Sequence, residues 1–366
     1  MRIKQFILIA AVAIVASSCA HSFEAQETQQ PAIGFGTWAE QLTKARTAGS
    51  NTFVADDDFA VYGYYSKTVN EQEVKTTVFD NVTVTASGSP VTWAYSPLRF
   101  WDPTADKYTF FAVSPASYAN NVNAQTGLFT SESIDFTTHD KDVLVATKKV
   151  VVAAGQAPKY SADPVVLAFN HIAAMIDVKV KKDAALPAEA TLRITNARLL
   201  NIQNTGTFEV TSYDGSSKPV VSWASTASGY YDWSEASLDV TQTTDYTHDP
   251  SVTEGDEKYL FNNFVLMPQT LDPDGENDPK LHIEYKVVTQ EATNEQSEVS
   301  TSYTADIAIK SFIVNDNKTN EGDAVGSSWA QGTHYTYILT IGANAITFTA
   351  NINPWETVTG YRYLLQ

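Results

Sequence analysis

Apolar and polar residues alternate along much of this 366-residue chain, and a period of two is typical of a β-strand with one buried face. In the segment His171–Lys181, every even-numbered residue from Ile172 to Val180 is apolar. The charged residues of the segment all stand at odd-numbered positions and are Asp177, Lys179 and Lys181. The pattern predicts a strand with one packed face and one solvated face.

The same period of two predicts strands through the whole chain. They are Phe59–Tyr65, Tyr108–Val113, Val143–Val152, Leu192–Leu200, Tyr259–Met267 and Lys280–Val288. Two alternating runs, one ending at Ile341 and the other starting at Ile346, predict a hairpin. Helical periodicity is scarce and β-branched residues are abundant, so we expect an all-β protein with two sandwich domains. The segment Gly155–Pro164, rich in Gly, Ala, Pro and Ser, is the candidate linker.

The N-terminal segment has the composition of an export signal. The basic residues Arg2 and Lys4 precede an apolar run, Phe6–Ala16, that is shorter than the roughly 20 residues of a membrane-spanning helix. Two serines then lead to Cys19, the only cysteine of the chain. This order predicts a lipoprotein that is cut before Cys19, acylated there and held by its lipid at a Gram-negative cell surface or periplasmic face. The alternative is a plain signal peptide with a chance cysteine.

Charge and motifs argue against several functional classes. The net charge is −18, whereas a nucleic-acid-binding protein needs a basic surface. The sequence has no nucleophile elbow, phosphate-binding glycine loop or dinucleotide fingerprint, so we expect neither catalysis nor a cofactor. The six histidines stand at no metal-ligand spacing, and His171 is expected to be a satisfied buried imidazole. Asp56–Asp58 is expected to be a solvated turn, while the alternating acids of Asp272–Asp278 suggest a calcium loop without the spacing of a known site.

Aromatic residues offer one binding hypothesis. Trp223 and Trp233, with Tyr230 and Tyr231, lie in a stretch rich in Ser and Gly and are the best candidates for stacking on a sugar. They would make the protein a monomeric surface lipoprotein that binds a glycan or a host protein.

Two further segments carry apolar or aromatic residues on one parity. In Ala32–Leu42 these residues are Ile33, Phe35 and Ala39, and the basic cluster from Lys44 to Thr47 follows. In Val358–Gln366 they are Tyr361, Tyr363 and Leu365. Each segment can form a strand about 30 Å long.

Seven blocks of aromatic and aliphatic residues follow one another in a distinctive order. They are Trp93–Trp101, Tyr108–Pro115, Asp142–Ala146, Phe169–Ala173, Val265–Gln269, Trp329–Tyr337 and Asn353–Glu356. In order and spacing the set resembles the fimbrillins, the lipoprotein precursors of pilus subunits in Bacteroides-type anaerobes. The resemblance covers nearly the whole chain and implies two tandem transthyretin-like β-sandwich domains in a structural protein of a cell-surface fimbria.

The resemblance also implies a route of assembly. A fimbrillin precursor is lipidated, exported and cut after an Arg or Lys at the end of its first strand, and a strand of a neighbouring subunit then fills the opened groove. Carried over to this chain, the divisions are a signal peptide 1–18, a propeptide with the first strand 19–46, and sandwiches 47–160 and 161–366. The cut falls between Arg46 and Thr47, and the donor strand of 358–366 presents Tyr361, Tyr363 and Leu365.

These expectations favour a stalk subunit, because the chain has both a removable first strand and a spare last one. Its partners would be other fimbrial subunits and, in the precursor, outer-membrane lipid through acylated Cys19. A tip subunit would need no donor tail, and an anchor would keep its lipid. Three alternatives stay open: Lys44 is the cut site, Arg46 is an ordinary exposed arginine, or Val358–Gln366 is the last strand of its own domain.

Overall fold

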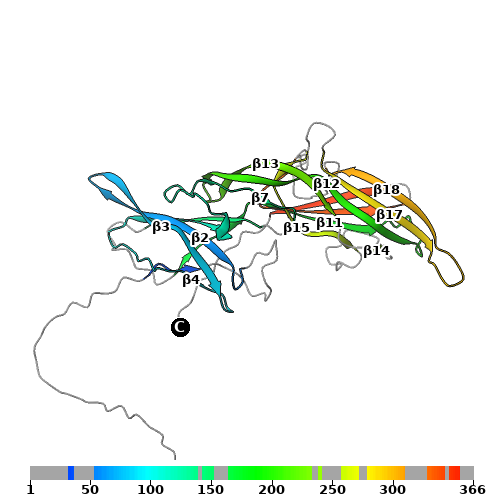
Figure 1. The fold of residues 1–366 in the computed structure, drawn as a ribbon, viewed down its shortest axis with the longest axis horizontal. Helices are drawn as coiled ribbons and strands as arrows, with labels where there is room; N and C mark the ends of the chain where they lie inside the picture. The colour runs from blue at the N-terminus through cyan, green and yellow to red at the C-terminus, as the bar shows by residue number, and fades with distance from the viewer. Residues whose placement is uncertain are drawn as a thin grey trace, which may run out of the picture. The chain divides into compact units, whose positions relative to one another are not determined.

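The alternating segments of the sequence form strands, and the all-β prediction is confirmed (Figure 1). The computed structural model describes residues 32–36, 53–138, 142–151, 164–232, 238–240, 257–271, 278–309, 328–342 and 346–354. These residues form 21 strands and one turn of 3-10 helix, η1 (Ala116–Tyr118). All of them belong to one compact unit, Pro31–Gln366. Within the described ranges, no helix has the length and apolar composition needed to cross a bilayer.

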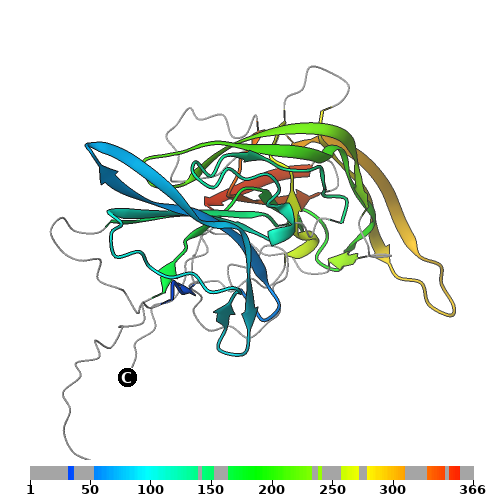
Figure 2. The same cartoon turned by 60° about the vertical axis from the view of Figure 1, so that its left-hand side comes forward.

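Six antiparallel strands form the first sheet. They are β2 (Asp58–Val69), β3 (Gln72–Ser87), β4 (Thr92–Ala94), β5 (Lys107–Ser114), β8 (Leu144–Val151) and β10 (Phe169–His171). Their order is β10-β8-β5-β2-β3-β4, and β2 and β3 form the long twisted hairpin that is blue in Figure 2. In β2 the six consecutive residues Phe59–Tyr64 are buried, so both faces of this sheet are covered.

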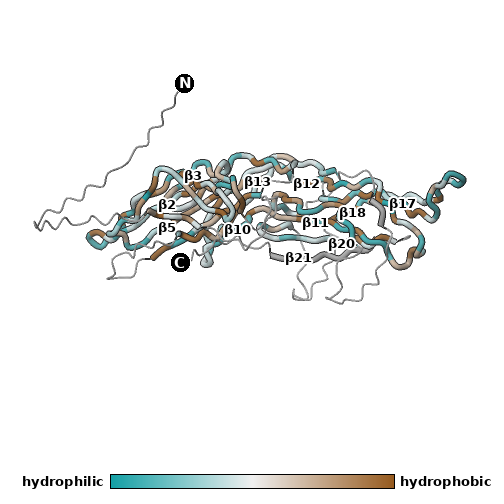
Figure 3. The backbone as a smooth tube through the Cα atoms, turned by 90° about the horizontal axis from the view of Figure 1, so that it is seen from below, coloured by the Kyte–Doolittle hydropathy of each residue, from teal (hydrophilic) through white to brown (hydrophobic). Residues whose placement is uncertain are grey.

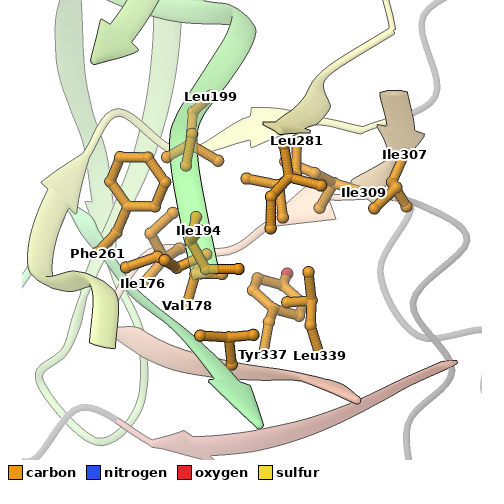
Figure 4. Packing of buried hydrophobic residues seen from close by; sticks show 14 of the residues in the cluster. Ile176, Val178, Ile194, Leu199, Phe261, Leu281, Ile307, Ile309, Tyr337 and Leu339 are labelled. Carbon is orange, nitrogen blue, oxygen red and sulfur yellow. The ribbon is translucent and has the colours of Figure 1, made fainter. Parts of the chain in front are cut away.

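Two further sheets pack face to face as a β-sandwich. One consists of β11 (Ala174–Lys182), β15 (Lys258–Leu266), β20 (Thr333–Ile341) and β21 (Ile346–Pro354), in the order β15-β11-β20-β21. The other has the order β13-β12-β17-β18 and consists of β12 (Thr191–Tyr213), β13 (Pro219–Asp232), β17 (Lys280–Gln290) and β18 (Val299–Ala308), with β14 (Leu238–Val240) paired to β12. The core between them includes Ile176, Val178, Ile194, Leu199, Leu281, Tyr337 and Leu339 (Figure 4).

The remaining strands are short. They are β1 (Phe35–Gly36), β6 (Phe129–Thr130), β7 (Ile134–Asp135), β9 (Val165–Val166), β16 (Gln269–Thr270) and β19 (Ser328–Trp329). Strands β6 and β7 both pair with β12, which also lies beside β13 and β17 (Figure 1). The second half of β12 lies outside the sandwich core: its Phe208 and Val210 belong to a second buried cluster, together with Phe111 and Val145 of the first sheet.

The predicted hairpin at Ile341 and Ile346 is confirmed as β20 and β21, but the prediction of a solvated face on β11 is wrong. Asp177 and Lys179 are buried because each finds a polar partner on a neighbouring strand or loop. The Asp177 carboxylate lies 2.8 Å from Nε2 of His334. The Lys179 ammonium lies 3.3 Å from the carboxylate of Glu257.

A surface site on β17 makes stability depend on pH. The Nδ1 atom of His282 lies 2.6 Å from the carboxylate of Asp306, and its Nε2 atom lies 3.3 Å from the carboxylate of Glu284. These residues belong to the hairpin of β17 and β18, whose turn is hydrophilic (Figure 3). The hydrogen bond to Asp306, followed by the bond to Glu284, raises the pKa of His282. Because the pKa of His282 is higher in the folded than in the unfolded protein, the protonated imidazole stabilises the fold. This contribution is complete at pH values below the unfolded pKa of about 6.5, and it is lost as the pH rises through the folded pKa.

We therefore expect His282→Gln to lower the free energy of unfolding at pH 5.5 and to leave it nearly unchanged at pH 8.5. The loss should not exceed about 1 kcal/mol, because solvent screens a half-exposed ion pair. Urea unfolding of the variant and the wild type at both pH values measures the difference. An equal loss at the two pH values would show that the imidazole acts through packing instead.

Candidate functional site

Most residues assigned to function from the sequence lie outside the described ranges and stay predictions. They are Cys19, Arg46, Thr47, Tyr361, Tyr363 and Leu365. Of the predicted first strand, Ala32–Leu42, residues 32–36 are described, and they build the candidate site.

Residues 32–36, here called the resident strand, lie in a slot between two other segments of the chain. The first wall of the slot is the segment that follows β4. An antiparallel bridge joins Ala32 to Phe100 of this wall. Next to the bridge, the backbone N–H of Ile33 donates to the carbonyl of Arg99 at 2.8 Å. One edge of the resident strand is therefore held by main-chain contacts that any extended segment could make.

The second wall of the slot is β9 with the residue that follows it. Strands β1 and β9 are parallel, with Phe35 opposite Val165. The N–H groups of Val165 and Leu167 donate to the carbonyls of Gly34 and Gly36, at 2.8 and 3.2 Å. The resident strand thus has hydrogen bonds along both edges, as an inner strand of a sheet does.

The inner face of the resident strand completes the core of the first sheet, as the shared parity of its apolar residues predicts. Ile33 is 0% exposed and Phe35 is 6% exposed. The Phe35 ring has edge-on contacts with four rings at centroid distances from 5.3 to 6.1 Å, those of Phe59, Phe79, Tyr95 and Phe110. Burying a large apolar side chain is worth about 1.5–3 kcal/mol, so the two side chains contribute a large share of the free energy that holds this short strand.

Tyr95 adds a polar contact that fixes the position of the resident strand. Its hydroxyl donates to the carbonyl of Ile33 at 2.6 Å and accepts from the N–H of Arg99 at 3.2 Å. Burial raises the pKa of Tyr95, so the hydroxyl keeps its proton at neutral pH. The Nε of Arg99 donates to the carbonyl of Val78 at 3.1 Å, which ties this wall to β3.

The sequence does not predict the two walls of the slot. The block Trp93–Trp101 stands out by its aromatic residues, but a local pattern cannot show that it faces residues more than sixty positions earlier. As built, the slot offers hydrogen bonds for a main chain and apolar pockets at alternate side chains. This is the chemistry of strand addition, with specificity set by the alternate pockets.

The aromatic residues proposed to bind a sugar do not share one exposed surface. Trp223 is half-buried, with its ring 5.2 Å from Phe208. Tyr231 is 3% exposed, and its hydroxyl donates to the carbonyl of Phe136 at 2.9 Å. Tyr230 is 59% exposed and lies under the Arg198 guanidinium, 5.2 Å from it, while Trp233 lies outside the described ranges. Among the described candidates, Tyr230 is exposed, Trp223 is half-buried and Tyr231 is buried.

Among the described residues, no three His, Cys, Asp or Glu side chains gather as they would around a metal ion. The expectation for His171 is confirmed, because this buried imidazole lies 3.0 Å from the carboxylate of Asp142. The Asp56–Asp58 segment is a turn in which the Asp57 carboxylate accepts the N–H of Val54 at 2.8 Å. Of the suggested calcium loop only Asp278 is described, so that suggestion stays untested.

Comparisons with known proteins agree with the resemblance seen in the sequence. The profile of the fimbrillin-like family matches residues 43–355. The chain is 22% identical to the fimbrium subunit Fim1C of Phocaeicola vulgatus, and the match covers 97% of each protein. A fimbrial protein from Bacteroides vulgatus, whose crystal structure is known, is 19% identical and superposes with a TM-score of 0.53 over 81% of this chain and 93% of that one. The latter similarity shows a shared fold.

Proposed function

This chain belongs to the fimbrillin-like family, and on that premise we propose that it is a stalk subunit of a cell-surface fimbria that assembles by strand exchange. Proteins of this family are structural subunits rather than enzymes. The observation that carries the proposal is the resident strand, which closes the core of the first sheet through a few main-chain hydrogen bonds and two buried side chains.

Cleavage after Arg46 would turn this strand into a separate piece. The cut lies ten residues beyond Gly36, on the chain that connects the resident strand to the rest of the protein. While the chain is intact, the strand is present at a high effective concentration next to its slot. After the cut, only the contacts inside the slot keep it there, and a strand from another subunit can take its place.

The same cut would release the subunit from the membrane. Cys19, the proposed lipidation site, lies on the N-terminal side of Arg46 together with the resident strand. Acylation would hold the precursor at the outer membrane, and a single proteolytic step would free the body from its lipid and make its slot available. Export and polymerisation are thereby coupled by the order of the segments.

The incoming strand would be residues 358–366 of a second copy. Strand β21 ends at Pro354, and the twelve residues after it span up to about 40 Å when extended. Tyr361, Tyr363 and Leu365 alternate along this tail, as Ile33 and Phe35 do along the resident strand. The tail can therefore offer two large side chains to the two inner pockets.

Deleting residues 358–366 should block polymerisation and leave the cleaved subunit folded. Size-exclusion chromatography and electron microscopy measure polymer, and thermal unfolding measures the stability of the monomer. Arg362→Ala, which keeps Tyr361, Tyr363 and Leu365, is the matched control and should still polymerise. If the deletion instead lowers the melting temperature strongly, the tail is the last strand of its own domain and the proposed donor role is wrong.

A further inference from the structure

The outer face of the slot is only partly filled by the resident strand. Phe100, which pairs with Ala32, is 50% exposed, and Leu98 in the same wall is 54% exposed. Residues opposite each other in an antiparallel pair project to the same face, with Cβ atoms about 4.5–5.5 Å apart. The resident strand therefore offers the Phe100 ring a single methyl group, and apolar surface stays open to solvent beside an otherwise occupied slot.

Gly34, the next outward residue of the resident strand, also leaves this face uncovered. Its position does not require glycine, because an added Cβ would lie 3.7 Å from the Pro164 Cβ, an ordinary packing distance. Glycine inside a strand also costs about 0.5–1 kcal/mol relative to alanine, since it loses more conformational freedom. The outward residues of the resident strand, Ala32 and Gly34, are therefore small, and at Gly34 a methyl group would fit.

We propose that Phe100, Leu98 and Pro164 form an outer subsite of the slot, and that its occupant is the tail of a second copy of this chain. The inference rests on the strand exchange proposed above. The tail carries large side chains on both parities, because Arg362 and Leu364 alternate with its three apolar or aromatic residues. When the tail runs opposite to the resident strand, with Tyr363 and Tyr361 in the pockets of Ile33 and Phe35, Leu364 takes the outward position of Ala32 and covers the exposed ring of Phe100.

The outer subsite makes the tail bind the slot more tightly than the resident strand does. The resident strand buries apolar side chains on its inner face alone, whereas the tail buries them on both faces of the slot. Both strands make the same kind of main-chain hydrogen bonds, so the difference in affinity comes from the outward side chains. A resident strand with small outward residues closes the core during export and is displaced once its covalent connection is cut.

The test measures binding of a fluorescent synthetic peptide of residues 358–366 to the full chain cleaved after Arg46, by fluorescence anisotropy. Phe100→Ala in the protein and Leu364→Ala in the peptide should each weaken binding about ten-fold, which is the loss expected for one large buried apolar contact. Combined, the two changes should weaken binding little more than either alone, because they remove the same contact. Tyr230→Ala, which removes an exposed aromatic ring from β13, is the matched control and should change nothing.

Unchanged binding with the Leu364→Ala peptide, or losses that multiply in the double change, would overturn the outer subsite. The peptide variant keeps this test valid even if Phe100→Ala fails to fold. A second measurement uses a variant whose resident strand itself covers Phe100. Ala32→Leu should lengthen the time that the resident strand stays bound in the cleaved chain about ten-fold. An unchanged half-life contradicts the inference. If the wild-type peptide does not bind at all, the proposal of strand exchange by this tail is wrong as well. If the wild-type and Leu364→Ala peptides bind equally well, only the proposal of the outer subsite is wrong.

Discussion

A chain carrying both Arg46→Ala and Lys44→Ala is expected to fold, to be acylated at Cys19 and to remain a membrane-held monomer. Without the cut, residues 37–52 keep the resident strand tethered beside its slot. A short tether gives an effective concentration of about millimolar, far above the concentration of free subunits. The tail of another copy would then compete against a strand that returns faster than it can be replaced, so polymer should be absent.

N-terminal sequencing and intact mass of protein taken from the cell surface test this expectation. Wild-type polymer should begin at Thr47, and the double variant should begin at acylated Cys19. The single variant Arg46→Ala is the control that assigns the cut, because processing after Lys44 would give a chain that begins at Ala45. Filaments of normal length from the double variant would show that assembly does not need the removal of the first strand.

Strand positions could be predicted where burial follows a local period of two, as in β17, which contains the predicted strand Lys280–Val288. In β2 and β5, which are buried on both faces, a short run of apolar and aromatic residues marks the strand instead. The predicted strands Phe59–Tyr65 and Tyr108–Val113 lie within β2 and β5. Strand β12, in contrast, continues far beyond the predicted end at Leu200. Its later inward positions include Asn204, which is polar, and Gly206, which has no side chain. Asn204 is only 6% exposed, but neither residue continues the apolar alternation by which a strand is predicted.

The remaining features depend on contacts between distant parts of the chain. Asp177 is buried because its carboxylate meets His334, 157 residues later, and no local pattern predicts such a pair. The inner face of the resident strand could be predicted, since Ile33 and Phe35 share a parity. The walls of its slot could not, because Arg99 and Val165 contribute backbone groups, which every residue type carries.

Phe35→Ala is expected to free the resident strand without any proteolytic cut while the body of the protein stays folded. Truncating a buried phenylalanine costs about 3–5 kcal/mol, which is comparable to the whole apolar contribution of Ile33 and Phe35. The cost to global stability cannot exceed the free energy that holds the strand, because beyond that point the strand leaves and the rest remains. The main effect should therefore be local opening of the slot.

Hydrogen exchange at two amides reports this opening directly. The N–H groups of Val165 and Leu167 donate to the resident strand, so both should lose protection in Phe35→Ala. Phe110→Ala is the matched control, because Phe110 is 0% exposed, contacts the same ring at 5.8 Å and belongs to β5. It should lower global stability by about 3–5 kcal/mol both before and after cleavage, whereas Phe35→Ala should have no effect once the strand has been removed. Wild-type protection of Val165 and Leu167 in Phe35→Ala would mean that main-chain hydrogen bonds hold the strand by themselves, and the exchange mechanism would then need an active release step.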